Sequence, residues 1–182
     1  MEMEVPLGAA LLMREPDIPA QPALGRTFEL WHGLVFRTAY RITGNAADAE
    51  DVLQTVFLRL AGRDSSSATV ENEAGYLRRA AVNAALDIVR SRQSMPTVPI
   101  IEDTSTTSSC TELREMREAL RRALARLNPK WAEMFALRYF EGYSNPQIAK
   151  SLGISQVLVA VTLHRARKQL QNDIRSYMGG RS

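Results

Sequence analysis

The sequence predicts an all-α protein built from two small helical domains that a flexible linker joins. Apolar residues recur at intervals of three and four along both blocks, which is the spacing of one helix face. Glycine, proline and small polar residues separate the periodic segments, and no alternating strand pattern occurs. The stretch SMPTVPIIEDTSTTSSCT, residues 94–111, contains two prolines and no helical period. It therefore predicts an extended, mobile linker between the two blocks.

Composition and charge indicate a globular protein with a basic C-terminal block. The chain has 182 residues, of which 45% are hydrophobic and 24% charged, and its net charge is +3. No apolar run approaches the roughly eighteen residues of a membrane span, so we expect no membrane insertion. The single cysteine, Cys110, excludes an internal disulfide framework and fits a reducing cytoplasm. Residues 112–175 carry 12 Lys/Arg against 6 Asp/Glu, whereas residues 26–92 carry 9 against 8. This asymmetry favours a nucleic-acid partner over a merely solvated basic surface.

Three helices are expected in the first block, residues 26–92, after a disordered tail at residues 1–25. The first runs from the apolar Phe28 to Gly44, which ends it, and Asn45 then caps the second. The second helix buries an apolar face and leaves most of its acidic side chains off that face. A loop at residues 62–75 precedes the third helix, whose core positions include Leu77 and Ala81.

Four helices are expected in the second block, residues 112–176, with a linker at 93–111 before it and a short tail at 177–182. Asn128 caps the second helix of this block and Pro129 occupies its first position. Ser144 caps the third helix, and Gly153 ends it with a backbone that requires positive φ. Ser155 then caps the fourth helix. The last two helices, joined by three residues, form a helix-turn-helix.

The final helix combines a basic end with an apolar beginning. Val159, Leu163, Ala166 and Leu170 recur at four, three and four residues, which predicts a buried stripe. Beyond that stripe, every residue from Val157 to Val161 is apolar, although a helix that reads DNA is expected to present polar groups to base edges.

Three segments of this chain resemble a known family. NAADAEDVLQTVFLRL, YLRRAAVNAALDIVRSR and ALARLNPKWAEMFALRYFEGYSNPQIAKSLGISQVLVAVTLHRARKQL look like the core-binding, minus-ten-binding and minus-thirty-five-binding segments of an extracytoplasmic-function (ECF) sigma factor. Such proteins are the smallest bacterial sigma factors of the sigma-70 type. They bind core RNA polymerase, direct it to promoters and help to melt the DNA. The resemblance covers about residues 26–92 and 112–175, with order, spacing and linker in agreement.

The resemblance implies roles for residues of the first block. Asp48, Asp51 and Gln54 would dock on the clamp helices of the polymerase β′ subunit, although the family often has Glu where Thr55 stands. The third helix would take the minus-ten element as a single strand, with Asn83 reading a flipped base and arginines holding phosphates. The minus-ten residues are Tyr76, Arg78, Arg79, Asn83, Arg90 and Arg92. Family members often carry Trp near the position of Tyr76 and a basic residue at that of Val82.

The fourth helix of the second block would enter the major groove at the minus-thirty-five element. The candidate contacts are Ser155, Gln156, Leu158, Thr162, Arg165, Arg167 and Lys168. Related sequences commonly carry Thr, Lys, Ser and Arg where this chain has Leu158, Ala160, Val161 and Thr162. Three interpretations of the apolar face follow: DNA binding with less direct base reading, contact with a protein such as an anti-sigma factor or a second copy, or packing against the other domain in a closed form.

Two other functions fit parts of the sequence beside that of an ECF sigma factor. One is a stand-alone helix-turn-helix regulator that binds DNA as a dimer, which leaves the acidic first block unexplained. The other is a sigma-like interaction protein that has lost promoter reading and titrates polymerase or an anti-sigma factor. Catalysis has little support, because no phosphate-binding glycine loop and no His/Cys cluster occur. We expect no cofactor and no metal. The expected partners are core RNA polymerase, through its β′ clamp helices and β flap, promoter DNA and an anti-sigma factor, in the cytoplasm and on the nucleoid.

Overall fold

The computed structural model describes residues 21–62, 72–94 and 108–179, and these form seven helices and no strand. The helices are α1 (Gln21–Thr43), α2 (Ala46–Ala61), α3 (Glu73–Ser94), α4 (Ser108–Arg126), α5 (Pro129–Tyr139), α6 (Asn145–Leu152) and α7 (Gln156–Gly179). The predicted all-α class and the two helical domains are confirmed. Residues 1–20 of the tail predicted at residues 1–25, and most of the predicted linker, lie outside the described residues.

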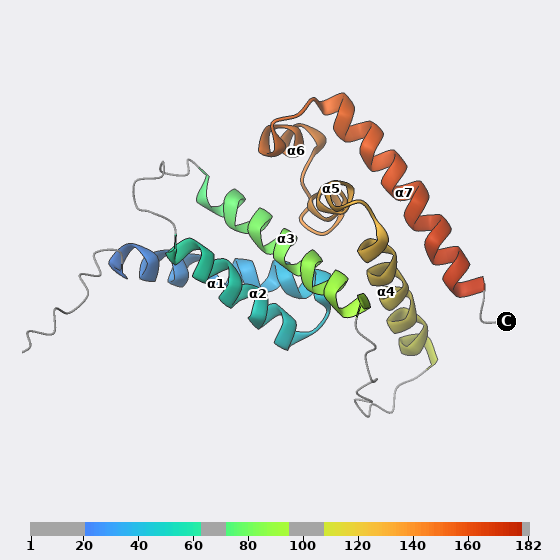
Figure 1. Cartoon of the computed structure of the whole chain (residues 1–182), viewed down its shortest axis with the longest axis horizontal. Helices are drawn as coiled ribbons and strands as arrows, with labels where there is room; N and C mark the ends of the chain where they lie inside the picture. Colours follow the sequence, from blue (N-terminus) through green and yellow to red (C-terminus); the bar gives the residue numbers. More distant parts are fainter. Residues whose placement is uncertain (1–20, 63–71, 95–107, 180–182) are drawn as a thin grey trace, which may run out of the picture.

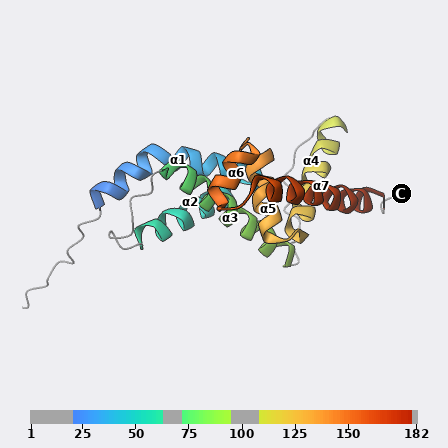
Figure 2. The same ribbon diagram turned by 90° about the horizontal axis from the view of Figure 1, so that it is seen from above.

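Helices α1, α2 and α3 pack on one another as the N-terminal domain, and α4, α5, α6 and α7 form the C-terminal domain (Figure 1). Helix α3 also contacts α4 and α5, so it lies between the N-terminal pair and the C-terminal domain. The view from above shows the same arrangement (Figure 2). The C-terminal domain therefore rests mainly on α3, and it also contacts the end of α1 through Arg41 and Arg121.

Local signals fix most helix boundaries where the sequence placed them. The Asn45 side chain accepts a hydrogen bond from the Asp48 backbone N–H at 3.2 Å, and that of Asn128 accepts from Lys130 at 3.0 Å. Ser144 and Gln147 bond reciprocally at the start of α6, which is a capping box. Gly153 closes α6 with a φ of 66°, a backbone conformation that glycine adopts without a steric penalty.

Several helices are longer than the sequence indicated. Helix α1 begins at Gln21 rather than after residue 25, and α7 continues to Gly179. Helix α3 begins at Glu73, three residues before the first expected residue. The Asn72 side chain accepts from the Gly75 backbone N–H at 2.9 Å at this end. The Glu73 carboxylate accepts from Thr27 and from the Trp31 indole, at 2.8 and 3.0 Å. These two bonds from α1 anchor the start of α3.

The buried core runs through both domains. Fully buried aliphatic side chains dominate it, as the hydrophobic effect requires. The largest of them are Ile42, Leu77, Leu86, Leu124, Leu127, Leu137 and Ile148. The expected stripe of α7, Val159 to Leu170, is buried at all four positions. None of the described helices is long and apolar enough to cross a lipid bilayer.

Candidate polymerase and nucleic-acid interface

The acidic face of α2 is smaller than the sequence indicated. Asp51 and Gln54 are exposed, but Asp48 is only 5% exposed and its carboxylate pairs with Arg92 of α3. Burial raises the pKa of Asp48 above its ordinary value of 3.8, and the attraction of Arg92 opposes this rise. Asp48 therefore joins α2 to α3 inside the N-terminal domain, and the sequence-based placement of Asp48 on the exposed face was wrong.

Two of the residues predicted to bind the minus-ten strand, Arg92 and Arg90, form ion pairs within the N-terminal domain. The Arg92 guanidinium pairs with Asp48, and Arg90 pairs with Asp87 at 3.0 Å, one turn away in α3.

Tyr76 is half-buried and packs against the core, and Val82 is completely buried. A basic side chain at position 82 would have no access to solvent here, so the valine follows from the packing of α3 in this chain.

The middle of α3 meets the C-terminal domain. The Arg79 Nε donates to the Glu133 Oε1 of α5 at 2.6 Å, and the Asn83 Nδ2 donates to the same oxygen at 3.0 Å. Arg79 also donates through Nη1 to the backbone oxygen of Ser151 at 3.0 Å. The Arg78 Nε lies 3.7 Å from the Glu141 Oε2. Three of the six predicted minus-ten residues thus lie together, and acceptors of the second domain contact them.

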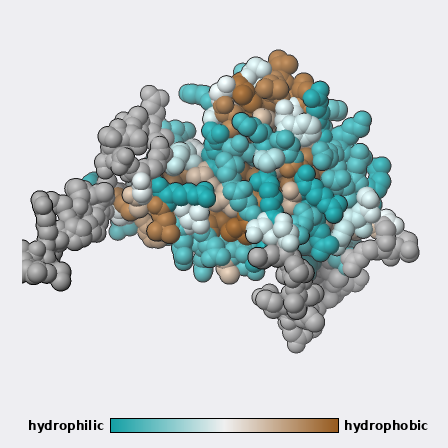
Figure 3. All heavy atoms as spheres, in the orientation of Figure 1, coloured by the Kyte–Doolittle hydropathy of each residue, from teal (hydrophilic) through white to brown (hydrophobic). Residues whose placement is uncertain are grey.

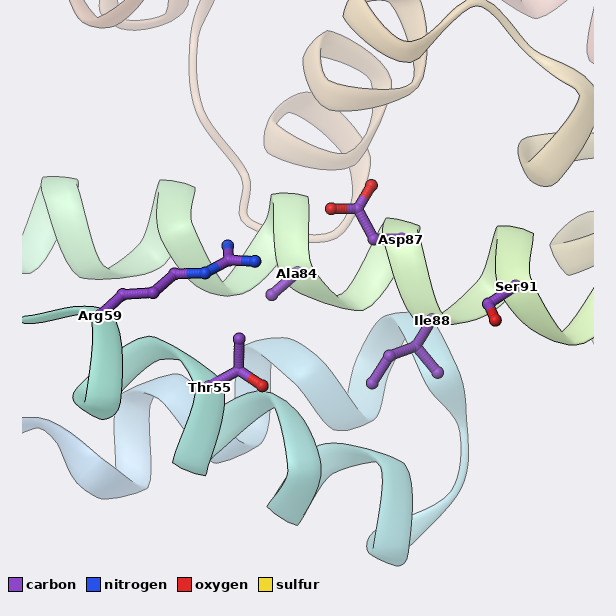
Figure 4. A pocket seen from close by; sticks show the side chains of 6 residues that line it. All are labelled: Thr55, Arg59, Ala84, Asp87, Ile88 and Ser91. Carbon is purple, nitrogen blue, oxygen red and sulfur yellow. The ribbon is translucent and has the colours of Figure 1, made fainter.

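Two shallow pockets line the junction of α2 and α3. One, of about 270 Å³, is formed by Val56, Arg59, Tyr76, Arg79, Ala80 and Asn83. The other, of about 260 Å³, is formed by Thr55, Arg59, Ala84, Asp87, Ile88 and Ser91 (Figure 4). Arg59 is exposed, extends from α2 toward α3 and borders both pockets. Sequence reasoning missed Arg59, because only the packing of the last turn of α2 against α3 places it beside Asn83.

The start of α7 presents an apolar surface to solvent. Val157, Leu158 and Val161 are 73%, 49% and 42% exposed, and hydrophobic residues gather over this end of the C-terminal domain (Figure 3). The third interpretation of this face, packing against the other domain, is therefore wrong for this structure. Thr162 is 5% exposed, so it belongs to the buried side of α7 and its sequence-based placement on the DNA-facing side was wrong. It follows the buried Val159 by three residues and so shares its side of the helix.

The other polar residues predicted to contact DNA at α7 are accessible. Ser155, Gln156, Arg165, Arg167 and Lys168 are exposed. The Ser155 hydroxyl accepts from the Leu158 backbone N–H at 3.2 Å and so caps the helix. The Arg167 guanidinium carbon lies 5.9 Å from the centre of the Tyr139 ring, which draws this cation toward α5.

Comparison with known proteins decides the family. The N-terminal domain matches the model of sigma-70 region 2 over residues 27–95, and the C-terminal domain matches that of sigma-70 region 4 over residues 117–170. The chain is 34% identical to the RNA polymerase sigma-E factor of Streptomyces avermitilis over 144 residues, 78% of this chain and 79% of that protein. The chain belongs to the sigma-70 family of RNA polymerase sigma factors, in its ECF group.

Other proteins that are similar to this chain are also described as sigma factors. It is 30% identical to the ECF sigma factor SigE of Mycolicibacterium smegmatis over 176 residues, 92% of this chain and 67% of that protein. It is 33% identical to the ECF sigma factor SigL of Mycobacterium tuberculosis over 159 residues, 84% of this chain and 89% of that protein. The sigma factor RpoE of Bartonella quintana, crystallised with the anti-sigma factor NepR, has the same fold. Its TM-score is 0.51 at 17% identity, with 84% of this chain and 97% of that chain covered.

The family assignment also removes one of the two alternative functions that the sequence left open. A stand-alone helix-turn-helix regulator is excluded as the main function, because the N-terminal domain has its own match to sigma-70 region 2. A sigma factor is an initiation factor for transcription, and its family has no known enzymatic activity. Among the described residues, no group of three or more His, Cys, Asp and Glu side chains is arranged to hold a metal ion.

Proposed function

We propose that this ECF sigma factor recognises promoters with two surfaces, α3 for the minus-ten strand and the start of α7 for the minus-thirty-five duplex. The protein works with core RNA polymerase in promoter-directed initiation of transcription. One observation supports the assignment of α3 to the minus-ten strand and of α7 to the minus-thirty-five duplex. Arg79 and Asn83 lie one turn apart on α3 and line one pocket with Tyr76, while a separate domain presents an exposed, capped helix end.

The face of α3 has the chemistry of a single-strand site. Guanidinium groups bind phosphate oxygens, and the amide of Asn83 can both donate to and accept from the edge of an unpaired base. The adjoining pocket of about 270 Å³ is bordered by the Tyr76 ring and by Arg59. An aromatic ring and a guanidinium plane are the groups on which unstacked bases pack. We assign Arg59 to this site beside the residues that the sequence indicated.

The start of α7 supports minus-thirty-five binding with little direct base reading. Exposed apolar side chains such as Val157 and Leu158 can contact the methyl groups of thymine in the major groove. Arg165, Arg167 and Lys168 supply the phosphate contacts, which position the helix without specifying sequence. We therefore expect A·T-rich minus-thirty-five elements and a large electrostatic share of the affinity.

Core polymerase is the proposed partner of the exposed polar residues of α2. Asp51 and Gln54 are accessible for a basic partner, and we propose that they contact the β′ clamp helices, with region 4 on the β flap. Asp48 would support this surface from below through Arg92 rather than by touching the partner. An anti-sigma factor is the proposed regulator, and the place of action is the cytoplasm and nucleoid.

A second candidate function is favoured by the exposed apolar start of α7. Val157, Leu158 and Val161 form a surface that suits a protein contact as well as DNA. In that case the protein binds core polymerase but titrates it, or an anti-sigma factor, without reading promoters. The two functions differ in whether the holoenzyme starts transcription at defined sites.

Run-off transcription separates these functions. Purified protein and core polymerase would be given a library of genomic fragments, and the starts would be sequenced. We expect discrete starts that share two upstream elements. The Asn83→Ala variant should lose about 1–3 kcal/mol of base discrimination and open promoters poorly, while it binds core polymerase as the wild type does. If the protein binds core polymerase but yields no defined transcription starts, the titration function is favoured. If the Asn83→Ala variant opens promoters as well as the wild type does, Asn83 does not belong to the minus-ten site.

A further inference from the structure

Two glutamates of the C-terminal domain occupy the polar face of α3. Glu133 in α5 is 7% exposed, and its Oε1 accepts from Arg79 and Asn83 at 2.6 and 3.0 Å. Glu141 follows α5, and its side chain is 3% exposed. It pairs with Arg41 of α1 at 3.0 Å and lies 3.7 Å from Arg78. These pairs, which we call the closure contact, join the C-terminal domain to α3 and α1 of the N-terminal domain.

The closure contact offers α3 the same chemistry as DNA. A carboxylate that accepts from a guanidinium replaces a phosphate oxygen, because both are anionic acceptors of charge-assisted hydrogen bonds. The Glu133 oxygen that accepts from the Asn83 amide replaces an acceptor on a base edge. One carboxylate oxygen thus engages both a phosphate-binding and a base-reading side chain. Single-stranded DNA and Glu133 cannot hold Arg79 Nε and Asn83 Nδ2 at the same time.

We propose that Glu133 and Glu141 act as an autoinhibitory DNA mimic, which keeps the minus-ten surface of the free sigma factor closed. The inference rests on the proposed function of α3 and adds a competitor from the same chain. A partner that binds only the open arrangement, such as core polymerase, shifts the population toward it and exposes the minus-ten residues. The free protein is thereby prevented from binding single-stranded DNA without polymerase.

The closure contact covers only one of the two proposed DNA-binding surfaces, that of α3. Gln156, Val157 and Leu158 at the start of α7 remain exposed in the same structure. The partners on α3 and α1 are partly accessible, with side-chain exposures of 41% for Arg79 and 51% for Arg41. The arginine side of these pairs is therefore accessible to water, while the two carboxylates are buried. Arg121 of α4 adds a weaker bond at 3.4 Å to the backbone oxygen of Ile42.

Binding of single-stranded DNA by the polymerase-free protein tests the proposal. A fluorescently labelled oligonucleotide of random sequence is titrated with the full chain and followed by fluorescence anisotropy. The double variant Glu133→Gln/Glu141→Gln keeps the side-chain shapes and removes both charges. It should bind roughly tenfold more tightly or better, since a mostly closed protein has its affinity reduced by its open fraction. Small-angle X-ray scattering should show a larger radius of gyration, with unchanged helix content by circular dichroism.

A matched control removes the same charge elsewhere. Glu29 and Glu50 are exposed residues of α1 and α2, so Glu29→Gln/Glu50→Gln changes the net charge equally and leaves the closure contact in place. Its affinity for the oligonucleotide should stay near that of the wild type. Adding Arg79→Ala and Asn83→Ala to the Glu133→Gln/Glu141→Gln variant should abolish the gain, because the side chains released by the glutamates are then missing.

Three results bear on the proposal. A gain that Arg79→Ala and Asn83→Ala reverse supports competition for these side chains. A double variant that binds no better than the control overturns the proposal, even where the wild-type holoenzyme gives defined transcription starts. A gain that survives Arg79→Ala and Asn83→Ala also overturns it, because the released surface is then a different one. Failure of the proposed function is read separately, from the absence of defined starts with the wild-type holoenzyme.

Discussion

At the scale of single residues, the ion pair between Asp48 and Arg92 changes the roles that the sequence predicted for both side chains. The sequence placed Asp48 on a polymerase surface and Arg92 on a DNA surface, and the structure joins them to each other. Desolvation is the largest influence on Asp48 and raises its pKa, so the ionised carboxylate is less favourable in the folded state than in water. The attraction of Arg92 recovers only part of this cost.

Stability measurements on Asp48→Asn and Arg92→Ala test this balance. We expect Asp48→Asn to leave the free energy of unfolding at pH 7 unchanged or slightly higher, because a neutral amide avoids the cost of burying the charge. Arg92→Ala should lower it by about 1–3 kcal/mol, since the buried carboxylate then lacks its donor. Combining the two changes should remove most of that loss. Urea unfolding followed by circular dichroism gives all three values, and additive effects would contradict the coupling.

The same carboxylate predicts the sign of a pH dependence. Because the pKa of Asp48 is higher in the folded than in the unfolded chain, the folded state binds more protons between the two values. The contribution of Asp48 to the free energy of unfolding is fully present below the unfolded pKa, near 3.8, and is lost as pH rises through the folded pKa. The difference in stability between the wild type and Asp48→Asn should therefore grow in favour of the variant as pH rises across this window.

At the scale of helices, the sequence predicted what local chemistry decides. Asn45, Asn128, Ser144 and Gly153 set helix boundaries through bonds to their own neighbours, and all four are where the pattern placed them. Long-range contacts were less accessible to prediction. The early start of α3 coincides with bonds from Thr27 and Trp31 to Glu73, more than forty residues away in sequence.

Helix α7 illustrates what periodicity can and cannot assign on a DNA-binding helix. Its buried stripe was confirmed, because intervals of three and four define one face. Thr162 was misassigned because resemblance to the family took it for a DNA contact, whereas its position three residues after Val159 turns it toward the core. The exposed cations Arg165 and Arg167 remain predicted phosphate contacts.

The double change Arg165→Ala/Arg167→Ala tests the phosphate role of α7. Affinity for duplex DNA should fall by a similar factor on all sequences, since phosphate contacts carry no base information. The slope of log affinity against log salt should become shallower by about 2, because each neutralised phosphate accounts for close to one unit of this slope. Anisotropy titrations of the holoenzyme on promoter and control duplexes at several salt concentrations provide both numbers. An unchanged slope would assign these arginines to the fold or to a protein contact.

At the scale of the whole molecule, the arrangement of the two domains was not accessible from the sequence. The family resemblance describes two domains that each bind DNA, and it gives no reason to expect that Glu133 and Glu141 cover α3. These glutamates lie on or just after α5, in a block whose net charge is positive, and sequence patterns do not distinguish them from solvated acidic residues. Only the packing of α5 on α3 brings them to the arginines.

If ion pairs dominate the closure contact, the shape of the free protein should depend on salt. The screening length falls from about 10 Å at 0.1 M salt to about 3 Å at 1 M, so partly exposed pairs such as Arg41–Glu141 weaken. The radius of gyration should rise over this range while helix content stays constant, because the cores of the helical domains are apolar. The Glu133→Gln/Glu141→Gln variant should be expanded already at low salt and change little. A salt-independent radius in the wild type would contradict this prediction, because apolar contacts of α4 and α5 with α3 would then hold the domains together.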